Sequence, residues 1–338
     1  MKVLVNGIGN IGSTLLHLLH AYKELLGIDT VFALKNAPMP WQEEDLKDIQ
    51  AMGVVVCTRG SENGYTALED VLSDIDYIFD CTNNGGGIKN KEWYDKLSNL
   101  KGASAQGSEK NFGTSFMTGI NDAIIKTEKY AHIVSCNTHS IACLLSTFTG
   151  NELSNLKEAD FVIVRRSEDI GNHERLVSAN VVSRHLDDTL GTHHSIDVLD
   201  LFQTVGISPK LSSSDITTPS QLMHGVRFNI GLKEPIAAKE VAERIANNPL
   251  VSSSTKFDSN VIFERGRRIG FQGRIYSHAV IIDNNILING NRIIGWAFIP
   301  QEGNTILSTV HAFLLQTNSA TVTEIMQQLT NELIKERW

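Results

Sequence analysis

Along the first 135 residues, short apolar runs alternate with segments of helical periodicity. The apolar runs predict buried strands over residues 2–6, 30–34, 53–58, 76–82 and 131–135. Leucines recur at helical spacing from Leu15 to Leu26 before Gly27, and further helices are expected over residues 43–52, 68–73 and 140–148. Strands that alternate with helices predict a parallel sheet with crossover helices, so the expected fold class is α/β.

From about residue 155 the pattern changes to longer alternating segments. These predict strands over residues 160–166, 222–232, 275–283 and 286–299, the last two joined by a turn at residues 283–285. The tail, residues 305–338, is expected to form two helices broken near Asn318, with Thr321 and Glu324 spaced as a capping box. We therefore expect a first domain of residues 1–136, to which helices 303–338 return, and an α+β domain of residues 137–302 with a mainly antiparallel sheet.

A glycine-rich hexapeptide lies between the first expected strand and the first helix. It reads Gly-Ile-Gly-Asn-Ile-Gly over residues 7–12, which is a GxGxxG pattern in the context that the motif requires. Gly7 permits the tight turn, Gly9 lets the backbone approach a pyrophosphate, and Gly12 allows helix and strand to pack closely. The alternative is a turn without a ligand. We expect a Rossmann-type dinucleotide-binding domain.

The end of the second expected strand distinguishes between two dinucleotides. An Asp or Glu there would hold the ribose hydroxyls of NAD, but the chain has Lys35-Asn36, and Asp29 precedes the strand. A lysine suits the 2′-phosphate of NADP, so NADP is the expected cofactor, alone or beside NAD. The alternative for Lys35 is a solvated surface side chain.

Cys136 follows an expected strand and precedes a helical pattern. Free backbone N–H groups and the helix dipole at such a position favour a thiolate. A thiolate beside a dinucleotide site can attack an aldehyde and be left as a thioester after hydride transfer. A buried structural cysteine is the alternative reading for Cys136, and it is the expected one for Cys57, Cys81 and Cys143.

Composition and charge exclude several classes of function. The chain has 338 residues with 30 Lys and Arg against 38 Asp and Glu, a net charge of −8, which argues against a nucleic-acid-binding protein. Its four cysteines have no zinc-site spacing and make no disulfide framework, so no metal site is expected. No apolar run is long enough to span a membrane, and a cytoplasmic location is expected.

Several short motifs in order resemble one known family, the archaeal-type (type II) glyceraldehyde-3-phosphate dehydrogenases. The resemblance extends over nearly the whole chain, which makes it more specific than any single motif. It rests on residues 5–12, Asp80-Cys81-Thr82 with 85–87 and 89–91, residues 106–110, Ser135-Cys136-Asn137-Thr138, Val164-Arg165-Arg166, Thr192-His193-His194, Leu222-Met223-His224 and Pro300-Gln301-Glu302.

The resemblance implies a role for each matching position. Cys136 would be the nucleophile and His193 the base, with His194 and His224 as alternative bases. The residues implied at the substrate are Ser135, Asn137, Arg165, His193 and His194. Those implied at the cofactor are Gly107, Arg166 and Gln301, together with Gly7, Gly9, Asn10, Ile11, Gly12 and Lys35.

The implied reaction is the reversible oxidation of D-glyceraldehyde 3-phosphate, with inorganic phosphate and NAD(P)⁺, to 1,3-bisphosphoglycerate. Residues 137–302 would form the catalytic domain, and the family implies a homotetramer. Arg165 and Arg166 are candidates for the two phosphate sites because guanidinium groups bind phosphate in a bidentate manner. The charged cluster at residues 264–268 is expected to be a solvated face.

The chain departs from the family pattern at two places. Ser195-Ile196-Asp197 stands where the family usually has Gly-Pro-Asp after the paired histidines, and His139-Ser140 replaces small residues after the cysteine motif. The affinity for the substrate, and the acceptor itself, are therefore open. The alternatives are another cysteine-dependent semialdehyde dehydrogenase of the same two-domain plan and a dinucleotide-binding regulator without catalytic activity.

Overall fold

The computed structural model describes residues 1–60, 64–107, 109–150, 152–167, 181–219 and 222–338, which form two compact units. The first unit consists of Met1–Thr118, Asp122–Ile133 and Ser308–Met326, and the second of Gly119–Asn121, Val134–Leu307 and Gln327–Trp338. The expected division at residue 136 into a cofactor domain and a catalytic domain stays a prediction.

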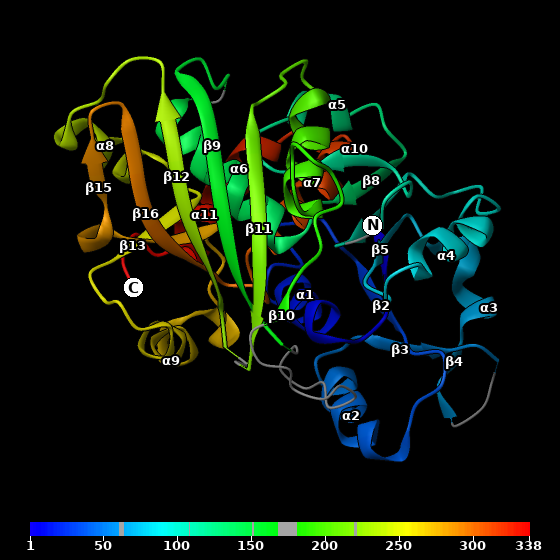
Figure 1. The fold of residues 1–338 in the computed structure, drawn as a ribbon. Helices are drawn as coiled ribbons and strands as arrows, with labels where there is room; N and C mark the ends of the chain where they lie inside the picture. The colour runs from blue at the N-terminus through cyan, green and yellow to red at the C-terminus, as the bar shows by residue number, and fades with distance from the viewer. Residues whose placement is uncertain (61–63, 108, 151, 168–180, 220–221) are drawn as a thin grey trace. The chain divides into compact units, whose positions relative to one another are not determined.

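The first unit is built on a parallel sheet with the strand order β4-β3-β2-β1-β5-β6-β8-β7 (Figure 1). Every strand pair among its described residues is parallel. Its strands are β1 (Lys2–Asn6), β2 (Thr30–Leu34), β3 (Val55–Thr58), β4 (Thr66–Ala67), β5 (Tyr77–Asp80), β6 (Gly102–Gln106), β7 (Thr114–Phe116) and β8 (Tyr130–Ile133). The α-helices between them are α1 (Asn10–Ala21), α2 (Glu43–Ala51), α3 (Leu68–Val71), α4 (Gly86–Tyr94) and α5 (Asp122–Ile125).

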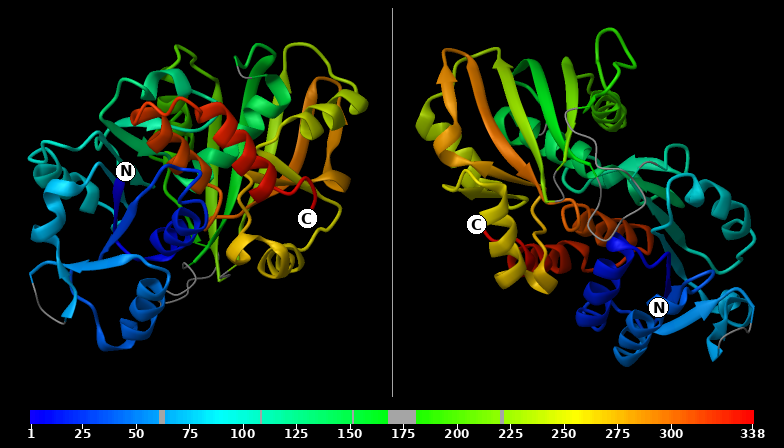
Figure 2. Two further views of the ribbon diagram at one scale, coloured as in Figure 1. Left: turned by 180° about the vertical axis from the view of Figure 1, so that it is seen from behind. Right: turned by 60° about the horizontal axis from the view of Figure 1, so that its bottom comes forward.

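Both faces of this parallel sheet are buried, as is usual for parallel sheets. On one face, Tyr77 and Phe79 pack against Phe313 of α10 (Ile306–Gln316), with ring centroids 5.0 and 5.5 Å away. On the other face, Leu4 and Ile78 share a core cluster with the α4 residue Tyr94. Figure 2 shows α10, drawn in orange-red, returning to this sheet from far along the chain.

The second unit holds a mixed sheet with the order β10-β11-β9-β12-β16-β14-β13, and β15 pairs with β16. The β9–β11 and β13–β14 pairs are parallel and the other described pairs are antiparallel. Its strands are β9 (Leu156–Arg166), β10 (Val181–Val182), β11 (Leu211–Thr218), β12 (His224–Leu232), β13 (Val251–Ser254), β14 (Ala279–Ile282), β15 (Leu287–Asn289) and β16 (Arg292–Ile299). Its α-helices are α6 (Cys136–Thr149), α7 (His193–Gln203), α8 (Ala238–Asn247) and α9 (Ser259–Ile269), and α11 (Val322–Leu333) ends in this unit.

Helix α6 packs against one face of the mixed sheet, behind the strands in Figure 1. The α6 residue Phe148 lies over Phe228 of β12, with ring centroids 5.3 Å apart. Phe228 pairs with Phe161 across the β9–β12 ladder, so this face carries large apolar side chains on adjacent strands. The alternate residues of β9, such as Val162, face away from α6.

The predicted fold class is confirmed, and β1 and β2 have the predicted bounds. Strand β6 was missed because its sequence, GASAQ, lacks large apolar side chains. Small residues are required there, since a Cβ at Gly102 would lie 3.0 Å from the Tyr77 ring and 3.1 Å from Gln316 Cβ. Helix α6 begins at Cys136 and not at residue 140, and the segment predicted as a strand over residues 275–283 is a strand only from Ala279 to Ile282.

None of the helices in the described ranges is both long and apolar enough to cross a bilayer.

Replacing Phe313 by Ala should destabilise the first unit. The ring is fully buried against Tyr77 and Phe79, and removing a buried phenyl ring costs about 3–5 kcal/mol of unfolding free energy. The matched control is Phe257→Ala, whose ring is 62% exposed and which should change stability by less than about 0.5 kcal/mol. Chemical denaturation measures both, and equal stabilities of the two variants would contradict the packing described here.

Candidate active site

Cys136 is the first residue of α6, and Ser135 caps the helix. The Ser135 hydroxyl oxygen accepts a hydrogen bond from the Thr138 N–H at 3.3 Å and lies 2.9 Å from Thr138 Oγ1. Cys136 is half-buried, whereas every other residue of α6 is buried. A buried helix is held rigidly, and its N-terminal N–H groups and dipole favour a negative charge at the first residue. The backbone of Cys136 is thus held in place while its side chain is half-buried.

The pKa values of the other three cysteines are raised above the ordinary value of a thiol. Burial raises the pKa of Cys57 to about 11 and that of Cys143 to about 12, and it raises the pKa of Cys81 further still. A thiol with so high a pKa carries almost no thiolate at neutral pH. Cys136 is therefore the candidate nucleophile of the chain.

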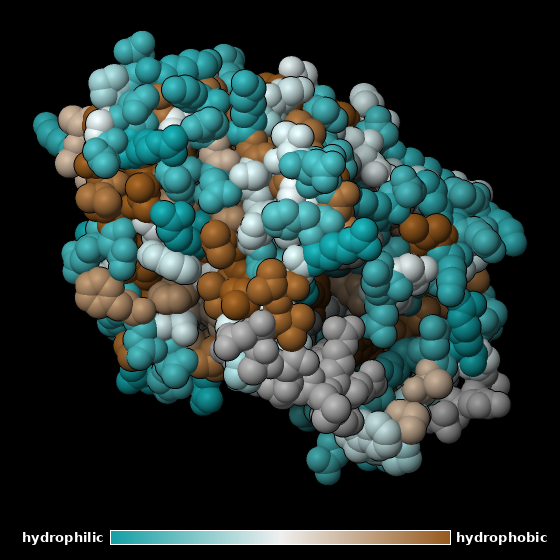
Figure 3. Space-filling view, in the orientation of Figure 1, coloured by the Kyte–Doolittle hydropathy of each residue, from teal (hydrophilic) through white to brown (hydrophobic). Residues whose placement is uncertain are grey.

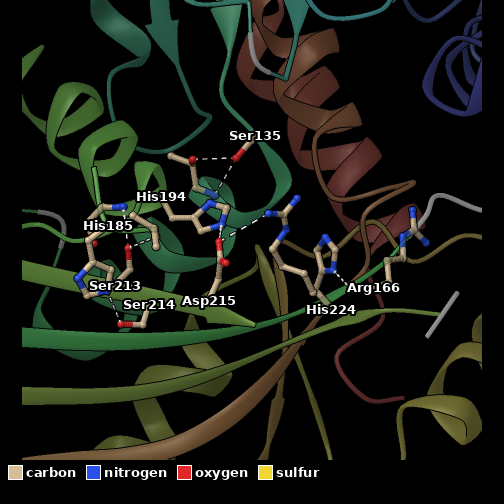
Figure 4. A network of polar contacts seen from close by, with 12 residues as sticks. Ser135, Arg166, His185, His194, Ser213, Ser214, Asp215 and His224 are labelled. Carbon is tan, nitrogen blue, oxygen red and sulfur yellow. Dashed lines mark hydrogen bonds and ion pairs between the residues drawn. The ribbon is translucent and has the colours of Figure 1, made fainter. Parts of the chain in front are cut away.

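His194 forms a buried pair with Asp215 of β11. His194 Nε2 lies 3.1 Å from Asp215 Oδ2, and both side chains are almost fully buried (Figure 4). Burial alone would raise the pKa of Asp215, but the His194 hydrogen bond, with help from the Ser183 hydrogen bond and the His194 and Arg165 charges, lowers it to about 2. An ionised Asp215 fixes the orientation of the His194 ring.

The chain positions this pair by joining the start of α7 to β11. The Thr192 N–H donates to the Ser213 carbonyl at 3.0 Å, and the Ser195 N–H donates to Ser213 Oγ at 3.1 Å. Ser213 and Asp215 are two residues apart on β11, so their side chains point to the same side of the sheet. Backbone and side chain of Ser213 therefore hold the paired histidines beside Asp215.

His193 lies against His194, with ring centroids 3.9 Å apart, and is half-buried. Burial lowers the pKa of His193 to about 4, with a further contribution from the His194 and Arg165 charges, although Asp197 and Asp215 oppose it. The imidazole is therefore neutral at pH 7 and can accept a proton. Among the paired histidines it is the one with partial access to solvent.

The two adjacent arginines at the end of β9 have different surroundings. Arg165 is partly exposed, and its Nη1 lies 3.7 Å from Asp215 Oδ2. Arg166 is buried, and its Nη1 donates to Glu302 Oε1 at 2.6 Å and to the Leu222 carbonyl at 2.9 Å. Arg165 is the guanidinium with access to an external anion, while Arg166 holds neighbouring segments of the chain together.

His224 is buried and has contacts at both ring nitrogens. Nδ1 accepts the Arg166 N–H at 2.9 Å, and Nε2 lies 2.6 Å from Gln301 Nε2. Burial, followed by the charges of Arg166 and Arg165, lowers the pKa of His224 well below its ordinary value. In this geometry His224 can reach a substrate only if the Gln301 side chain moves, and Gln301 itself is directed at His224.

A buried polar region lies behind the start of α6. Asn304 Nδ2 donates to the Cys136 carbonyl at 3.0 Å and to the His278 carbonyl at 3.2 Å. His139, one of the departures from the family, packs its ring against His278 with centroids 5.0 Å apart. Burial lowers the pKa of His278 well below its ordinary value. Asn137, expected at the substrate, is buried at the start of the same helix.

The glycine loop has the geometry that a pyrophosphate requires. Gly7 has φ +100°, and a Cβ at Gly12 would lie 2.0 Å from the Gly7 carbonyl, so the turn and the close packing both demand glycine. A Cβ at Gly9 would meet nothing within 4 Å, and Gly9 precedes α1 without a side-chain cap. The start of α1, from Asn10 and Ile11 onward, thus follows an N-cap residue that supplies no side-chain hydrogen bond.

The ends of β2 and β3 carry basic groups, and one carboxylate, Glu69, lies near them and accepts the Gly60 N–H at 3.1 Å. The Lys35 N–H donates to the Cys57 carbonyl, which aligns the ends of β2 and β3, and Arg59 follows β3. Arg59 Nε donates to Asn36 Oδ1 at 3.2 Å, and its guanidinium lies over the Trp93 ring. Asp29 instead pairs with the N-terminal amine at 2.6 Å.

The glycine-rich segment after β5 already donates backbone N–H groups to a protein carboxylate. Glu109 is buried and accepts the Gly85 N–H at 2.5 Å and the Ile88 N–H at 3.1 Å, at the start of α4. This helix start therefore offers no free anion site, although the motif is rich in glycine. Gly107, expected at the cofactor, has φ +74° with open space beside its Cα, and Ser108 lies outside the described residues.

Sequence reasoning missed two residues of these sites, Asp215 and Arg59. Asp215 lies in a polar strand, Leu211–Thr218, twenty-one residues from His194, and no local motif marks it. Arg59 directly follows an apolar strand, and this position at the carboxyl edge of a parallel sheet was the available signal.

Comparisons with known proteins identify a full-length similarity. No family model matches the chain. The chain is 27% identical to the glyceraldehyde-3-phosphate dehydrogenase of Sulfolobus acidocaldarius, covering 99% of this chain and 97% of that protein. It is 25% identical to that of Metallosphaera sedula, with 92% and 91% covered, and 26% identical to that of Methanoregula boonei, with 99% and 97% covered. The predicted resemblance is confirmed over nearly the whole chain.

The buried neutral histidines should make the protein less stable in acid. Because the pKa values of His224 and His278 are lowered on folding, only the unfolded chain gains protons there as the pH falls below about 6.5. Each such histidine then lowers the free energy of unfolding by up to about 1.4 kcal/mol per pH unit. Chemical denaturation between pH 7 and pH 4.5 should show that the free energy of unfolding of His278→Asn depends less steeply on pH than that of the wild type, by about this amount. The variant His20→Asn, at an exposed position, should have the same pH dependence as the wild type. An unchanged slope in His278→Asn would contradict this account.

Proposed function

We propose that this chain, similar over nearly its whole length to archaeal glyceraldehyde-3-phosphate dehydrogenases, catalyses the phosphorylating, reversible oxidation of D-glyceraldehyde 3-phosphate with a nicotinamide dinucleotide. The observation that carries the proposal is Cys136, half-buried at the N-terminus of an otherwise buried helix. The reaction belongs to glycolysis and, in reverse, to gluconeogenesis.

Cys136 acts as the nucleophile. Its thiolate adds to the aldehyde carbon, and the carbonyl oxygen of the substrate takes up a proton to give a hemithioacetal. When bound, the nicotinamide supplies the hydride acceptor. Loss of hydride from the carbon and of the hydroxyl proton to a base leaves a thioester on Cys136. Inorganic phosphate then attacks the thioester carbon, which releases 1,3-bisphosphoglycerate and regenerates the thiolate.

His193 is the proposed base, with His194 as its alternative. The His193 imidazole is neutral at pH 7 because burial lowers its pKa to about 4, and it is the more accessible of the pair. His194 is oriented by Asp215 and would stabilise charge near the reacting atoms. His224 remains a third candidate that would require Gln301 to move. Ser135 and Asn137, on either side of the thiol, are proposed to line the substrate.

Arg165 is the proposed anion contact. It is partly exposed beside Asp215, and a guanidinium can bind a phosphate through two parallel hydrogen bonds. Arg166 is engaged with Glu302, so we assign it to positioning the segment that carries Gln301. Any contact of Arg166, Gln301 or Gly107 with the cofactor is part of the proposal.

The cofactor is proposed to lie on the glycine loop, with its pyrophosphate against Gly9 and the start of α1. This fits the open space at Gly9 and the tight packing at Gly12. Lys35, Asn36 and Arg59 would meet the adenosine ribose, where two cations favour the 2′-phosphate of NADP over the free hydroxyl of NAD.

A cytoplasmic homotetramer is the proposed assembly. On the face of the mixed sheet opposite α6, Val162, Val164 and Ile294 are only partly buried, and Figure 3 shows apolar side chains gathered over the strands of this sheet. Exposed apolar patches of this kind mark protein interfaces, which supports contact with a second copy of the chain.

Cofactor kinetics test the substrate and the dinucleotide together. Reduced nicotinamide should form, as its absorbance shows, when the protein is mixed with glyceraldehyde 3-phosphate, phosphate and NADP⁺. Lys35→Ala and Arg59→Ala should each raise KM for NADP⁺ about tenfold, the loss of one charge-assisted contact of about 1.4 kcal/mol, with little change for NAD⁺. Lys23→Ala serves as the control variant. Equal effects on the two cofactors would contradict the assignment of these side chains to a 2′-phosphate.

The role of the thiol is tested by Cys136→Ser and by alkylation. Cys136→Ser should abolish activity, because a hydroxyl is a far weaker nucleophile than a thiolate at neutral pH, whereas Cys143→Ser should keep it. Iodoacetate should label Cys136 much faster than Cys57 or Cys143. Full activity in Cys136→Ser would overturn the mechanism. Rapid labelling of Cys136 without activity on this aldehyde would instead favour another semialdehyde, and neither labelling nor activity would favour a regulator.

A further inference from the structure

The paired histidines and Asp215 form a set of metal-ligating groups. Donor atoms of His193, His194 and Asp215 all lie within 4.8 Å of one another. From the sequence no metal site is expected, because the four cysteines lack the spacing of a zinc site. The fold creates the set by holding the start of α7 against β11 through Ser213.

We propose that His193, His194 and Asp215 bind a divalent transition metal, with Zn²⁺ as the best match, and that the bound ion reversibly inhibits the enzyme. Two imidazoles and one carboxylate are ligands typical of Zn²⁺ and its neighbours in the first transition row. Mg²⁺ and Ca²⁺ prefer all-oxygen sites. The binding of the ion is independent of the proposed function, and only its inhibitory effect rests on it.

The existing geometry is close to that of a metal centre. His194 Nε2 and Asp215 Oδ2 are 3.1 Å apart, and two ligands at about 2.0–2.1 Å from a tetrahedral Zn²⁺ are separated by about 3.4 Å. The ion can therefore replace the shared proton with only a small movement of these two side chains. His193, which is half-buried, can turn its ring to complete the set and leaves a side open to solvent.

Two buried atoms of the cluster also lack a partner. Among the described residues, Asp215 Oδ1 and His194 Nδ1 have no hydrogen bond, and both residues are more than nine-tenths buried. Unsatisfied buried polar atoms are costly and frequently mark the place of a water or an ion. A metal bound through both carboxylate oxygens would use Asp215 Oδ1.

Arg165 opposes a cation at this place, as does the N-terminus of α7. The Arg165 guanidinium lies 3.7 Å from Asp215 Oδ2, but its side chain is 36% exposed and can turn toward solvent. The dipole at the N-terminus of α7 opposes a positive charge only weakly. Both effects make the site one of moderate affinity, which suits reversible regulation better than permanent occupancy.

Metal binding would stop catalysis by a direct route. The lone pairs of His193 and His194 that bind the ion are those needed to accept a proton from the substrate. Arg165 would have to leave Asp215, which disturbs the proposed anion contact. Zn²⁺ and phosphate should therefore compete for this cluster.

Cobalt spectroscopy tests the site without relying on activity. The full-length Cys136→Ser protein, which lacks the reactive thiol, is titrated with Co²⁺. We expect the intense visible bands of four-coordinate Co²⁺ without a thiolate charge-transfer band, bleached by Zn²⁺ and not by Mg²⁺. Asp215→Asn and His193→Asn in this background should each weaken binding about tenfold or more. The matched control is His185→Asn, which removes an exposed histidine bonded to Ser214 on the same strand as Asp215.

The outcomes separate this proposal from the proposed function. Absence of the four-coordinate spectrum, or equal Co²⁺ affinity in folded Asp215→Asn, His193→Asn and His185→Asn, would overturn the metal site even if the enzyme is active. If the protein has no dehydrogenase activity, the spectra still decide whether the metal binds. In the active wild-type enzyme, Zn²⁺ should inhibit competitively with phosphate and EDTA should restore the rate. An unchanged reaction rate at saturating Zn²⁺ would contradict the proposed inhibition.

Discussion

The start of α6 is the constraint on which the candidate chemistry depends. Ser135 caps the helix, Asn304 holds the Cys136 carbonyl, and the remaining thirteen residues of the helix are buried. A helix buried on all sides cannot shift to follow a substrate, so the backbone of Cys136 is held in one place. The dipole of the same helix end favours a negative charge on the candidate nucleophile.

Candidate catalytic groups from distant segments are held beside one another by strand pairing. Parallel pairing of β9 with β11 places Arg165 opposite Thr217, two residues from Asp215 on the same face. Ser213 on β11 fixes the start of α7, and with it His193 and His194. Strand β11 thus connects the paired histidines, the carboxylate of Asp215 that orients His194 and the Arg165 guanidinium beside them. The same convergence accounts for the lowered pKa of Asp215 and for a set of donors able to bind a metal.

Local chemistry was predictable from the sequence, and long-range convergence was not. The glycine loop and the capped cysteine each combine a strand, a turn and a helix start within a dozen residues, so their structure follows from nearby residues. Strand β6 escaped prediction because neighbouring side chains at Tyr77 and Gln316 demand small residues, which erases the apolar signal. The role of Asp215 was not predicted because its position beside Arg165 and His194 depends on the long-range pairing of β9 with β11. Arg166, predicted to touch an anion, is engaged by Glu302 from a segment 136 residues away.

The central claim is that Cys136 carries the substrate as a thioester. Intact-protein and peptide mass spectrometry can test it after mixing the enzyme with glyceraldehyde 3-phosphate and NADP⁺ in the absence of phosphate. The account predicts a single phosphoglyceroyl adduct on the peptide that contains Cys136, which disappears when inorganic phosphate is added. An adduct on another residue, or reduction of the dinucleotide with no adduct on Cys136, would contradict it.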